Sequence, residues 1–168
     1  MRIFGLAGWS GSGKTTLLAT LIPEFVARGL TVSSIKHAHH EFDIDRPGKD
    51  SWRHRQAGAH EVMVASSRRW ALMHELRDTA EPPFEELVAK MSPVDLLLVE
   101  GWKRHAHPKL EVHRPSLGKP LLYPEDPDIV AIASDEPIAA PIPLLPLGDA
   151  GAVADFITDH LRLAPWRS

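Results

Sequence analysis

Eight residues near the start of the chain have the types and the spacing that are needed to hold a phosphate group. The phosphate-loop pattern G-x-x-x-x-G-K-[ST] is matched at every fixed position by Gly8-Trp9-Ser10-Gly11-Ser12-Gly13-Lys14-Thr15. Glycines let such a backbone turn so that several N–H groups, together with the positive end of a following helix, face one bound anion. We therefore expect Lys14 to reach the β- and γ-phosphates of a nucleotide, and Thr15 to ligate Mg²⁺.

The residues on either side of this loop have the properties that the motif requires. Residues 2–7 are mostly apolar and predict a short buried strand, while residues 14–28 predict a helix that ends at Gly29. The order strand, glycine-rich loop, helix is the setting in which a phosphate loop works. This context disfavours the alternative, which is a glycine- and serine-rich turn that binds no ligand.

An acid that could complete a magnesium site ends the most apolar segment of the chain. Residues 95–100 are typical of a buried parallel strand, and Glu100 is the last of them. A phosphate loop normally needs a carboxylate at such a strand end to hold its Mg²⁺, so we predict Glu100 as a metal ligand. The alternative is a solvated acid at a strand end. Asp95 begins the same strand and should lie at the far edge of the sheet.

Ionisable residues are dense after the second predicted strand, which covers residues 30–35. Lys36 ends this strand and could contact nucleotide phosphates, while Asp45 or a histidine could orient a water molecule for hydrolysis. A transition-metal site is a further possibility, with the potential ligands His37, His39, His40, Asp43 and Asp45. These side chains could equally donate hydrogen bonds to phosphates, and an ordinary polar surface loop is favoured over the metal site.

The segment after Glu100 is basic and aromatic. Lys103, Arg104 and Lys109 could bind a second anionic group beyond the nucleotide, and Trp102 could either stack on a heterocycle or pack in the core.

Composition narrows the classes of protein that fit. The chain has 168 residues, of which 43% are hydrophobic, and a formal net charge of −3, so we expect one domain, 1–168, without a general attraction for nucleic acid or membranes. Cysteine is absent, which excludes disulfides and thiolate chemistry. No apolar run approaches the length of a membrane span and no leader precedes the first strand, so we expect a soluble cytoplasmic protein.

Strands and helices alternate along the sequence. Helices are predicted at 49–56, from 84, and at 150–161, and further strands at 110–112, 129–133 and 142–147. Alternation of this kind predicts an α/β fold: a single-domain P-loop NTPase with a mostly parallel twisted sheet flanked by helices. Residues 61–65 and 70–73 flank a four-residue turn and predict a β-hairpin extension, whose apolar residues favour a homodimer formed through the hairpin.

Several segments, taken together and in order, resemble the molybdopterin-guanine dinucleotide biosynthesis protein B (MobB) family. They are residues 8–17, 36–40, 45–51, 57–59, 98–103 and 108–112. The resemblance implies a cytoplasmic, usually homodimeric GTP-binding adaptor with weak GTPase activity, which works with the guanylyltransferase that joins GMP to molybdopterin. It also implies that phosphates and Mg²⁺ contact Gly11, Gly13, Lys14, Thr15 and Thr16, with Glu100 as the acid of the metal site. Ser12, within the same loop, is a further candidate for binding the nucleotide.

The chain lacks the Asn-Lys-x-Asp sequence that many GTPases use to recognise guanine. Asp135 follows a predicted strand and could accept hydrogen bonds from guanine N1–H and N2–H₂, or it could be an ordinary turn residue before Pro137. Two other functions remain open. A small-molecule kinase would need a mobile lid, for which Arg68 and Arg69 are candidates, and a metal-insertion chaperone would use the histidines.

Overall fold

The computed structural model describes residues 1–38, 42–102 and 105–163. Contacts divide the chain into two compact units, which we describe separately. The sheet unit comprises residues 1–37 and 92–168, and the hairpin unit comprises residues 38–91. The fold class predicted from the sequence is confirmed, whereas the single domain over 1–168 stays a prediction.

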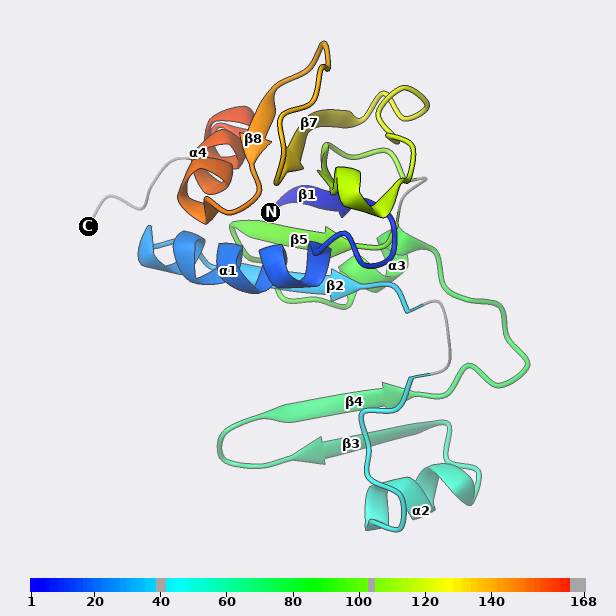
Figure 1. The fold of residues 1–168 in the computed structure, drawn as a ribbon. Coiled ribbons are helices and arrows are strands. Elements are labelled where there is room, and N and C mark those ends of the chain that lie inside the picture. Colours follow the sequence, from blue (N-terminus) through cyan, green and yellow to red (C-terminus); the bar gives the residue numbers. More distant parts are fainter. Residues whose placement is uncertain (39–41, 103–104, 164–168) are drawn as a thin grey trace. The chain divides into compact units, whose positions relative to one another are not determined.

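The sheet unit is built on six described strands that run parallel to one another in the order β2-β5-β1-β6-β7-β8 (Figure 1). Its elements are β1 (Arg2–Ala7), α1 (Lys14–Ala27), β2 (Val32–Lys36), β5 (Leu96–Glu100), β6 (Lys109–His113), a 3₁₀ turn η1 (Pro115–Leu117), β7 (Ile129–Ser134), β8 (Leu144–Pro146) and α4 (Ala150–Leu161). All the predicted elements of this unit are present, and η1 was not predicted.

The ends of two predicted strands differ from the structure. The second strand was expected to begin at residue 30, but Leu30 closes helix α1, since its N–H donates to the Phe25 carbonyl and Gly29 takes φ 80°. The strand therefore begins at Val32 and extends to Lys36. The last strand covers only residues 144–146 of the expected 142–147.

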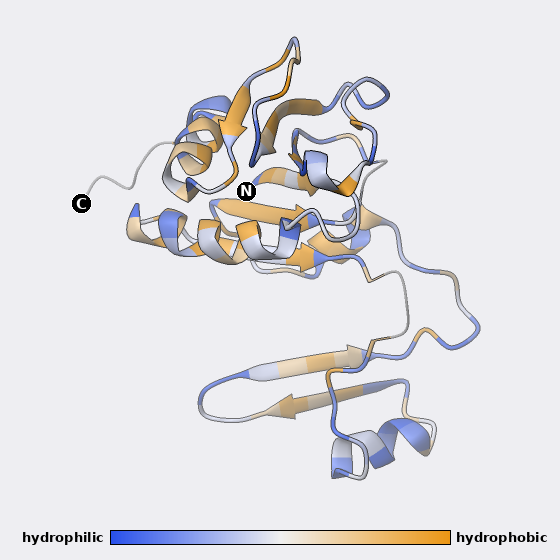
Figure 2. Ribbon diagram, viewed as in Figure 1, coloured by the Kyte–Doolittle hydropathy of each residue, from blue (hydrophilic) through white to orange (hydrophobic). Residues whose placement is uncertain are grey.

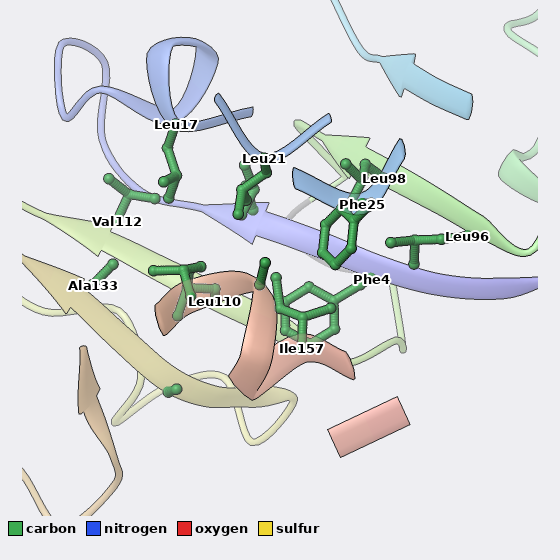
Figure 3. Packing of buried hydrophobic residues seen from close by; sticks show 14 of the residues in the cluster. Phe4, Leu17, Leu21, Phe25, Leu96, Leu98, Leu110, Val112, Ala133 and Ile157 are labelled. Atoms are coloured by element: carbon green, nitrogen blue, oxygen red, sulfur yellow. The ribbon is translucent and has the colours of Figure 1, made fainter. Parts of the chain in front are cut away.

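Helices α1 and α4 pack on the same face of the sheet and bury the apolar core (Figure 3). Leu17, Leu21 and Phe25 recur every four residues, so they form one stripe along α1. This stripe packs against strand residues such as Phe4 and Leu98. Burial of this kind fixes the start of α1, and with it the loop that precedes the helix.

The opposite face of β6 is covered by polar contacts. Lys109 and Glu111 alternate with the core residues Leu110 and Val112 and are buried. The Glu111 carboxylate accepts hydrogen bonds from the backbone N–H groups of residues 122 and 123, at 2.8 and 3.0 Å.

Lys109 differs from the sequence-based interpretation. Its ammonium pairs with Asp126 at 3.1 Å and Asp128 at 3.5 Å, and the residue is only 2% exposed. The suggestion that it binds a second anionic ligand was therefore wrong.

His107 packs against the middle of β1. Any side chain at Gly5 would clash with its imidazole, which explains a glycine inside a central strand. Burial lowers the pKa of His107 to about 4, and the nearby positive charge of Lys109 acts in the same direction. His107 is therefore neutral at physiological pH.

The hairpin unit contains α2 (Asp50–Gln56), α3 (Phe84–Ala89) and the antiparallel strands β3 (Glu61–Ala65) and β4 (Trp70–His74). Its loops are held by Arg55, whose guanidinium contacts Asp43 at 2.7 Å and Glu75 at 2.9 Å. Figure 2 shows α2 as mainly hydrophilic and the strands of the six-stranded sheet as mainly hydrophobic.

Large apolar side chains are exposed in the hairpin unit. Met63 lies opposite Leu72, and Ala65 lies opposite Trp70, so these residues share one face of the ribbon. Met63 is 61% and Trp70 66% exposed. Val62 is one of the apolar hairpin residues, within 61–65, that the sequence suggested for a dimer contact, but it is buried.

Candidate functional site

One edge of the sheet collects most of the residues that the sequence singled out. All six described strands of the sheet unit are parallel, so the C-terminal ends of β1, β2, β5, β6 and β7, and the segments that follow them, share this edge. They carry the glycine-rich loop, Lys36, Glu100, Arg114 and Asp135, respectively. Ligands of open α/β sheets bind at such an edge.

The glycine-rich loop, residues 8–13, adopts a backbone that side chains would not tolerate. Gly8, Gly11 and Gly13 have φ values of 143°, 80° and 100°. A Cβ atom on Gly8 would lie 2.5 Å from the Val112 carbonyl oxygen and 2.7 Å from the Ser12 Oγ. The loop therefore packs closely on β6 before Gly13 caps helix α1.

Lys14, which follows this loop, and Ser12, which lies within it, are the polar side chains that favour a bound anion. Lys14 curls back so that its ammonium donates to the carbonyl oxygens of Gly8, at 2.9 Å, and Trp9, at 2.8 Å. Ser12 is 1% exposed, and its hydroxyl is buried without a hydrogen-bond partner among the described residues. A buried hydroxyl without a partner is unfavourable, and an anion in the loop would offer it an acceptor.

Thr15, Glu100 and Lys36 form a polar cluster beside the loop. The Thr15 hydroxyl donates to Glu100 Oε1 at 2.8 Å, and Lys36 Nζ lies 3.4 Å from the same oxygen and 3.5 Å from Thr15 Oγ1. Two neighbouring ligands of an octahedral Mg²⁺ ion with bonds of about 2.0–2.1 Å are separated by about 2.9 Å. The Thr15–Glu100 separation fits that geometry, so both predicted metal ligands are suitably placed to hold Mg²⁺.

Arg114 is a residue of this site that the sequence interpretation missed. Its Nε donates to the Ser12 carbonyl at 3.1 Å, and its guanidinium pairs with Asp135 Oδ2 at 2.6 Å. A Cβ atom on Gly13 would lie 3.5 Å from the same guanidinium. Arg114 thus links the glycine-rich loop to Asp135, the predicted guanine contact. Its position directly after a strand that ends at the ligand-binding edge is the signal that could have identified it.

The residues after Arg114 also touch the loop. The Trp9 indole N–H donates to the Pro120 carbonyl at 2.8 Å, and the Lys119 ammonium lies 5.8 Å from the centroid of the Trp9 ring. These contacts hold the outer part of the loop against the chain that follows β6.

Asp45, the predicted water-orienting residue, belongs to the hairpin unit. Its carboxylate accepts from the Ser51 hydroxyl at 2.9 Å and from the backbone N–H of Arg46 at the same distance. Arg55 Nε lies 3.5 Å from its other oxygen. Within its own unit, Asp45 thus helps to fix the loop before α2, and its catalytic role stays a prediction.

The histidine prediction is only partly covered by the described residues. The backbone N–H of His37 donates to the Glu100 carbonyl at 2.8 Å, and its ring lies 5.0 Å from that of Trp102, measured between centroids. His39, His40, Lys103 and Arg104 lie outside the described residues. Within the described part of the chain, no group of three or more His, Asp or Glu side chains could hold a metal ion. Among the helices of the same residues, none is long and apolar enough to cross a membrane.

Comparisons of the sequence with known proteins identify one family. Residues 3–135 match the family model described as molybdopterin guanine dinucleotide synthesis protein B. The molybdopterin-guanine dinucleotide biosynthesis adapter protein of Escherichia coli (strain K12) is 42% identical over 163 residues, which cover 95% of this chain and 93% of that protein. The adapter protein of the same name from Haemophilus influenzae is 43% identical over 164 residues, or 95% of this chain and 89% of that protein.

Solved structures show the same fold. The MobB protein of Bacillus subtilis superimposes with a TM-score of 0.74 at 22% identity, covering 96% of this chain and 98% of that one. A MobB homologue from Bacillus stearothermophilus gives a TM-score of 0.72 at 23% identity, covering 98% of this chain and all of that one.

Proposed function

The chain belongs to the molybdopterin guanine dinucleotide synthesis protein B family, and from this premise we propose that it acts as an adapter in molybdopterin-guanine dinucleotide biosynthesis by binding GTP with Mg²⁺. The nucleotide would occupy the glycine-rich loop. The metal would be held by Thr15 and Glu100.

One observation carries the nucleotide part of this proposal. The Thr15 hydroxyl and the Glu100 carboxylate meet at 2.8 Å directly after a loop whose glycines have positive φ values. These two side chains are 85 positions apart in the sequence, yet the fold brings them together where an Mg²⁺·phosphate group would need them. The unpartnered Ser12 hydroxyl in the same loop adds a donor for phosphate.

The residues of the site bind and position rather than supply a strong base. Backbone N–H groups of residues 11–16 and the N-terminus of α1 would hold the phosphates, with Lys14 moving from the Gly8 and Trp9 carbonyls to phosphate oxygens. The metal, when bound, would neutralise charge that develops on the phosphates. Orientation of the attacking water by Asp45, which belongs to the hairpin unit, or by a histidine stays a prediction. Hydrolysis with these groups would be slow, so we propose a weak GTPase at most.

Guanine recognition is proposed for Asp135. Its carboxylate pairs with Arg114 at 2.6 Å at the edge of the sheet where the strands end. A carboxylate can accept from N1–H and N2–H₂ of guanine together. Adenine lacks both donors, so this contact would favour GTP over ATP.

Calorimetry with GTP, ATP and XTP in magnesium buffer tests the proposal. We expect the wild type to prefer GTP and Lys14→Ala to lose most of its affinity for all three. Asp135→Asn should shift preference towards XTP, because an amide matches the N1–H donor and O2 acceptor of xanthine. Failure of the folded wild type to bind any of the three would contradict the nucleotide role. An unchanged GTP/XTP ratio in Asp135→Asn would remove Asp135 from base recognition.

The partners would be the molybdopterin guanylyltransferase and molybdopterin or its molybdenum form. A pull-down of purified guanylyltransferase with this chain, with and without GTP, tests the first of them. No binding in either condition would count against an adapter role towards that enzyme. A cytoplasmic location stays a prediction.

We further propose a homodimer formed through the hairpin unit. The exposed face with Met63, Trp70 and Leu72 would meet its counterpart in a second copy, because this ribbon of two described strands has unpaired edges and an uncovered apolar face. Light scattering should show a dimer that Trp70→Glu dissociates. Val26→Glu, at a residue of the sheet unit that is 57% exposed, should leave the dimer intact. A monomeric wild type would refute this assembly.

The two alternative functions have less support. The candidate lid residues of a kinase, Arg68 and Arg69, occupy the hairpin turn, where Ser66 contacts the Arg69 carbonyl. Phosphorylated molybdopterin in a single-turnover assay with GTP would favour the kinase. Tight Ni²⁺ or Zn²⁺ binding that is lost in His39→Ala with His40→Ala would favour the chaperone.

A further inference from the structure

The ammonium of Lys36 lies at the place where the two predicted metal ligands meet. It is 3.4 Å from Glu100 Oε1 and 3.5 Å from Thr15 Oγ1, and these two oxygens are 2.8 Å apart. Lys36 is the last residue of β2 and pairs in register with Glu100 at the end of β5. Its backbone is thus fixed beside the carboxylate by the sheet itself.

We propose that Lys36 excludes divalent metal from Thr15 and Glu100 in the nucleotide-free protein, so that Mg²⁺ enters only together with a nucleotide whose phosphates draw the lysine away. The inference rests on the proposed nucleotide function and deepens it, because it assigns Lys36 a part in the order of binding. Lys36 is then a positioning residue with two alternative partners, the carboxylate or the phosphates.

Charge is the first reason for this exclusion. Glu100 is buried and carries one negative charge, which the Lys36 ammonium balances. A divalent cation that arrived alone would place two further positive charges beside that ammonium, and like charges at such short distances repel strongly in a partly buried site. A nucleotide triphosphate reverses the balance, because its negative charges attract both the metal and the lysine.

Mobility is the second reason. The Lys36 side chain is 59% exposed, so it can leave Glu100 without disturbing the core. An exposed ion pair contributes little free energy, and hence the lysine can change partners at small cost. Its other contact, to the Thr15 hydroxyl, is at the limit of hydrogen-bond length and adds little to hold it in place.

Mn²⁺ binding to the nucleotide-free protein, measured by the electron paramagnetic resonance signal of free Mn²⁺, tests the proposal. Lys36→Met removes the charge and keeps much of the length of the side chain. We expect this variant to bind Mn²⁺ up to about fivefold more tightly than the wild type, which is the factor that corresponds to an exposed ion pair of about 1 kcal/mol. Lys36→Arg retains the charge and should match the wild type. Lys90→Met is the matched control, because Lys90 is a similarly exposed lysine that pairs with Glu86 in the hairpin unit, and it should also match the wild type.

The double variant Lys36→Met with Glu100→Gln locates the new binding. If the metal binds at Glu100, the gain in Mn²⁺ affinity should disappear in this protein. Equal Mn²⁺ affinity of the wild type and Lys36→Met overturns the proposal, and so does a gain that survives Glu100→Gln. A thermal melt of each variant confirms that it is folded.

Nucleotide titrations separate this inference from the proposed function. If the wild type binds GTP but Lys36→Met gains no Mn²⁺ affinity, the exclusion by Lys36 is refuted while the nucleotide function stands. If Lys36→Met gains Mn²⁺ affinity but no protein binds GTP, the nucleotide function fails and only the exclusion of metal survives.

Discussion

Replacing Glu100 by glutamine should remove the Mg²⁺ dependence of nucleotide binding and leave the fold intact. The amide oxygen can still accept from the Thr15 hydroxyl, but the ion pair with the half-exposed Lys36 is lost. That pair contributes at most about 1 kcal/mol, and exchange of a charged acceptor for a neutral one costs about 1 kcal/mol. We expect a loss of about 1–2 kcal/mol in the free energy of unfolding, which is a fall of about 2–8 °C in Tm for a chain of this size.

The effect on the metal should be larger than the effect on stability. Interactions with a charged group contribute about 1.5–3 kcal/mol, which corresponds to a factor of about 10–150 in affinity. Calorimetry of GTP in Mg²⁺ and in EDTA gives two dissociation constants, and their ratio isolates the metal. In Glu100→Gln this ratio should fall by that factor towards one, because GTP binding weakens in Mg²⁺ but not in EDTA.

Glu111→Gln is the matched control, since it makes the same substitution at another buried glutamate of the sheet. Glu111 accepts two backbone N–H groups, and an amide would turn its own NH₂ towards one of them. We expect this variant to lose about 2–3 kcal/mol in the free energy of unfolding. Its ratio of GTP dissociation constants in Mg²⁺ and in EDTA should match that of the wild type. The reasoning is refuted if Glu100→Gln retains that ratio or if Glu111→Gln abolishes it.

Two further predictions concern the glycine-rich loop and pH. Gly8→Ala should abolish nucleotide binding and lower Tm, because its Cβ would lie 2.5 Å from the Val112 carbonyl oxygen. Gly58→Ala is the control: Gly58 has φ 107° and lies in open space, so this variant should lose only the backbone strain of about 1–3 kcal/mol. Equal Tm values for the two variants would contradict this prediction. Because the pKa of His107 is about 4 in the folded chain and near 6.5 when unfolded, the unfolded state takes up the proton first. The free energy of unfolding should therefore fall by about 2–3 kcal/mol as pH drops from about 6.5 to 4. Denaturant titrations at several pH values should show that the free energy of unfolding depends less on pH in His107→Gln than in the wild type. In His54→Gln, at an exposed histidine, this pH dependence should match that of the wild type.

The positions of the secondary structure could be predicted because their signals are local. The run before Glu100 is apolar at every position from 96 to 99, and all five residues of β5 are buried in the structure. The meeting of Thr15 with Glu100 also follows from the sequence, since parallel strands end at one edge. The apolar pattern and the parallel order of the strands were sufficient to predict where these residues lie.

Residues whose roles depend on distant partners could not be assigned in this way. Arg114 matters because the Ser12 carbonyl and Asp135 lie within its reach, and neither is near it in sequence. Lys109 was interpreted as a loop cation, but it is the first residue of β6 and points away from the core face towards Asp126 and Asp128. Only tertiary structure reveals such pairings.

The place of the hairpin unit in the chain has a consequence for how the protein tolerates cleavage. Residues 38–91 connect β2 to β5, and these two strands are direct neighbours, paired at five positions from Val32↔Leu96 to Lys36↔Glu100. A protease that nicks this connection would therefore sever the polypeptide between strands that remain hydrogen-bonded to each other. We expect the two fragments to stay associated after limited proteolysis, so that the protein can be expressed as two complementing halves divided within residues 38–91.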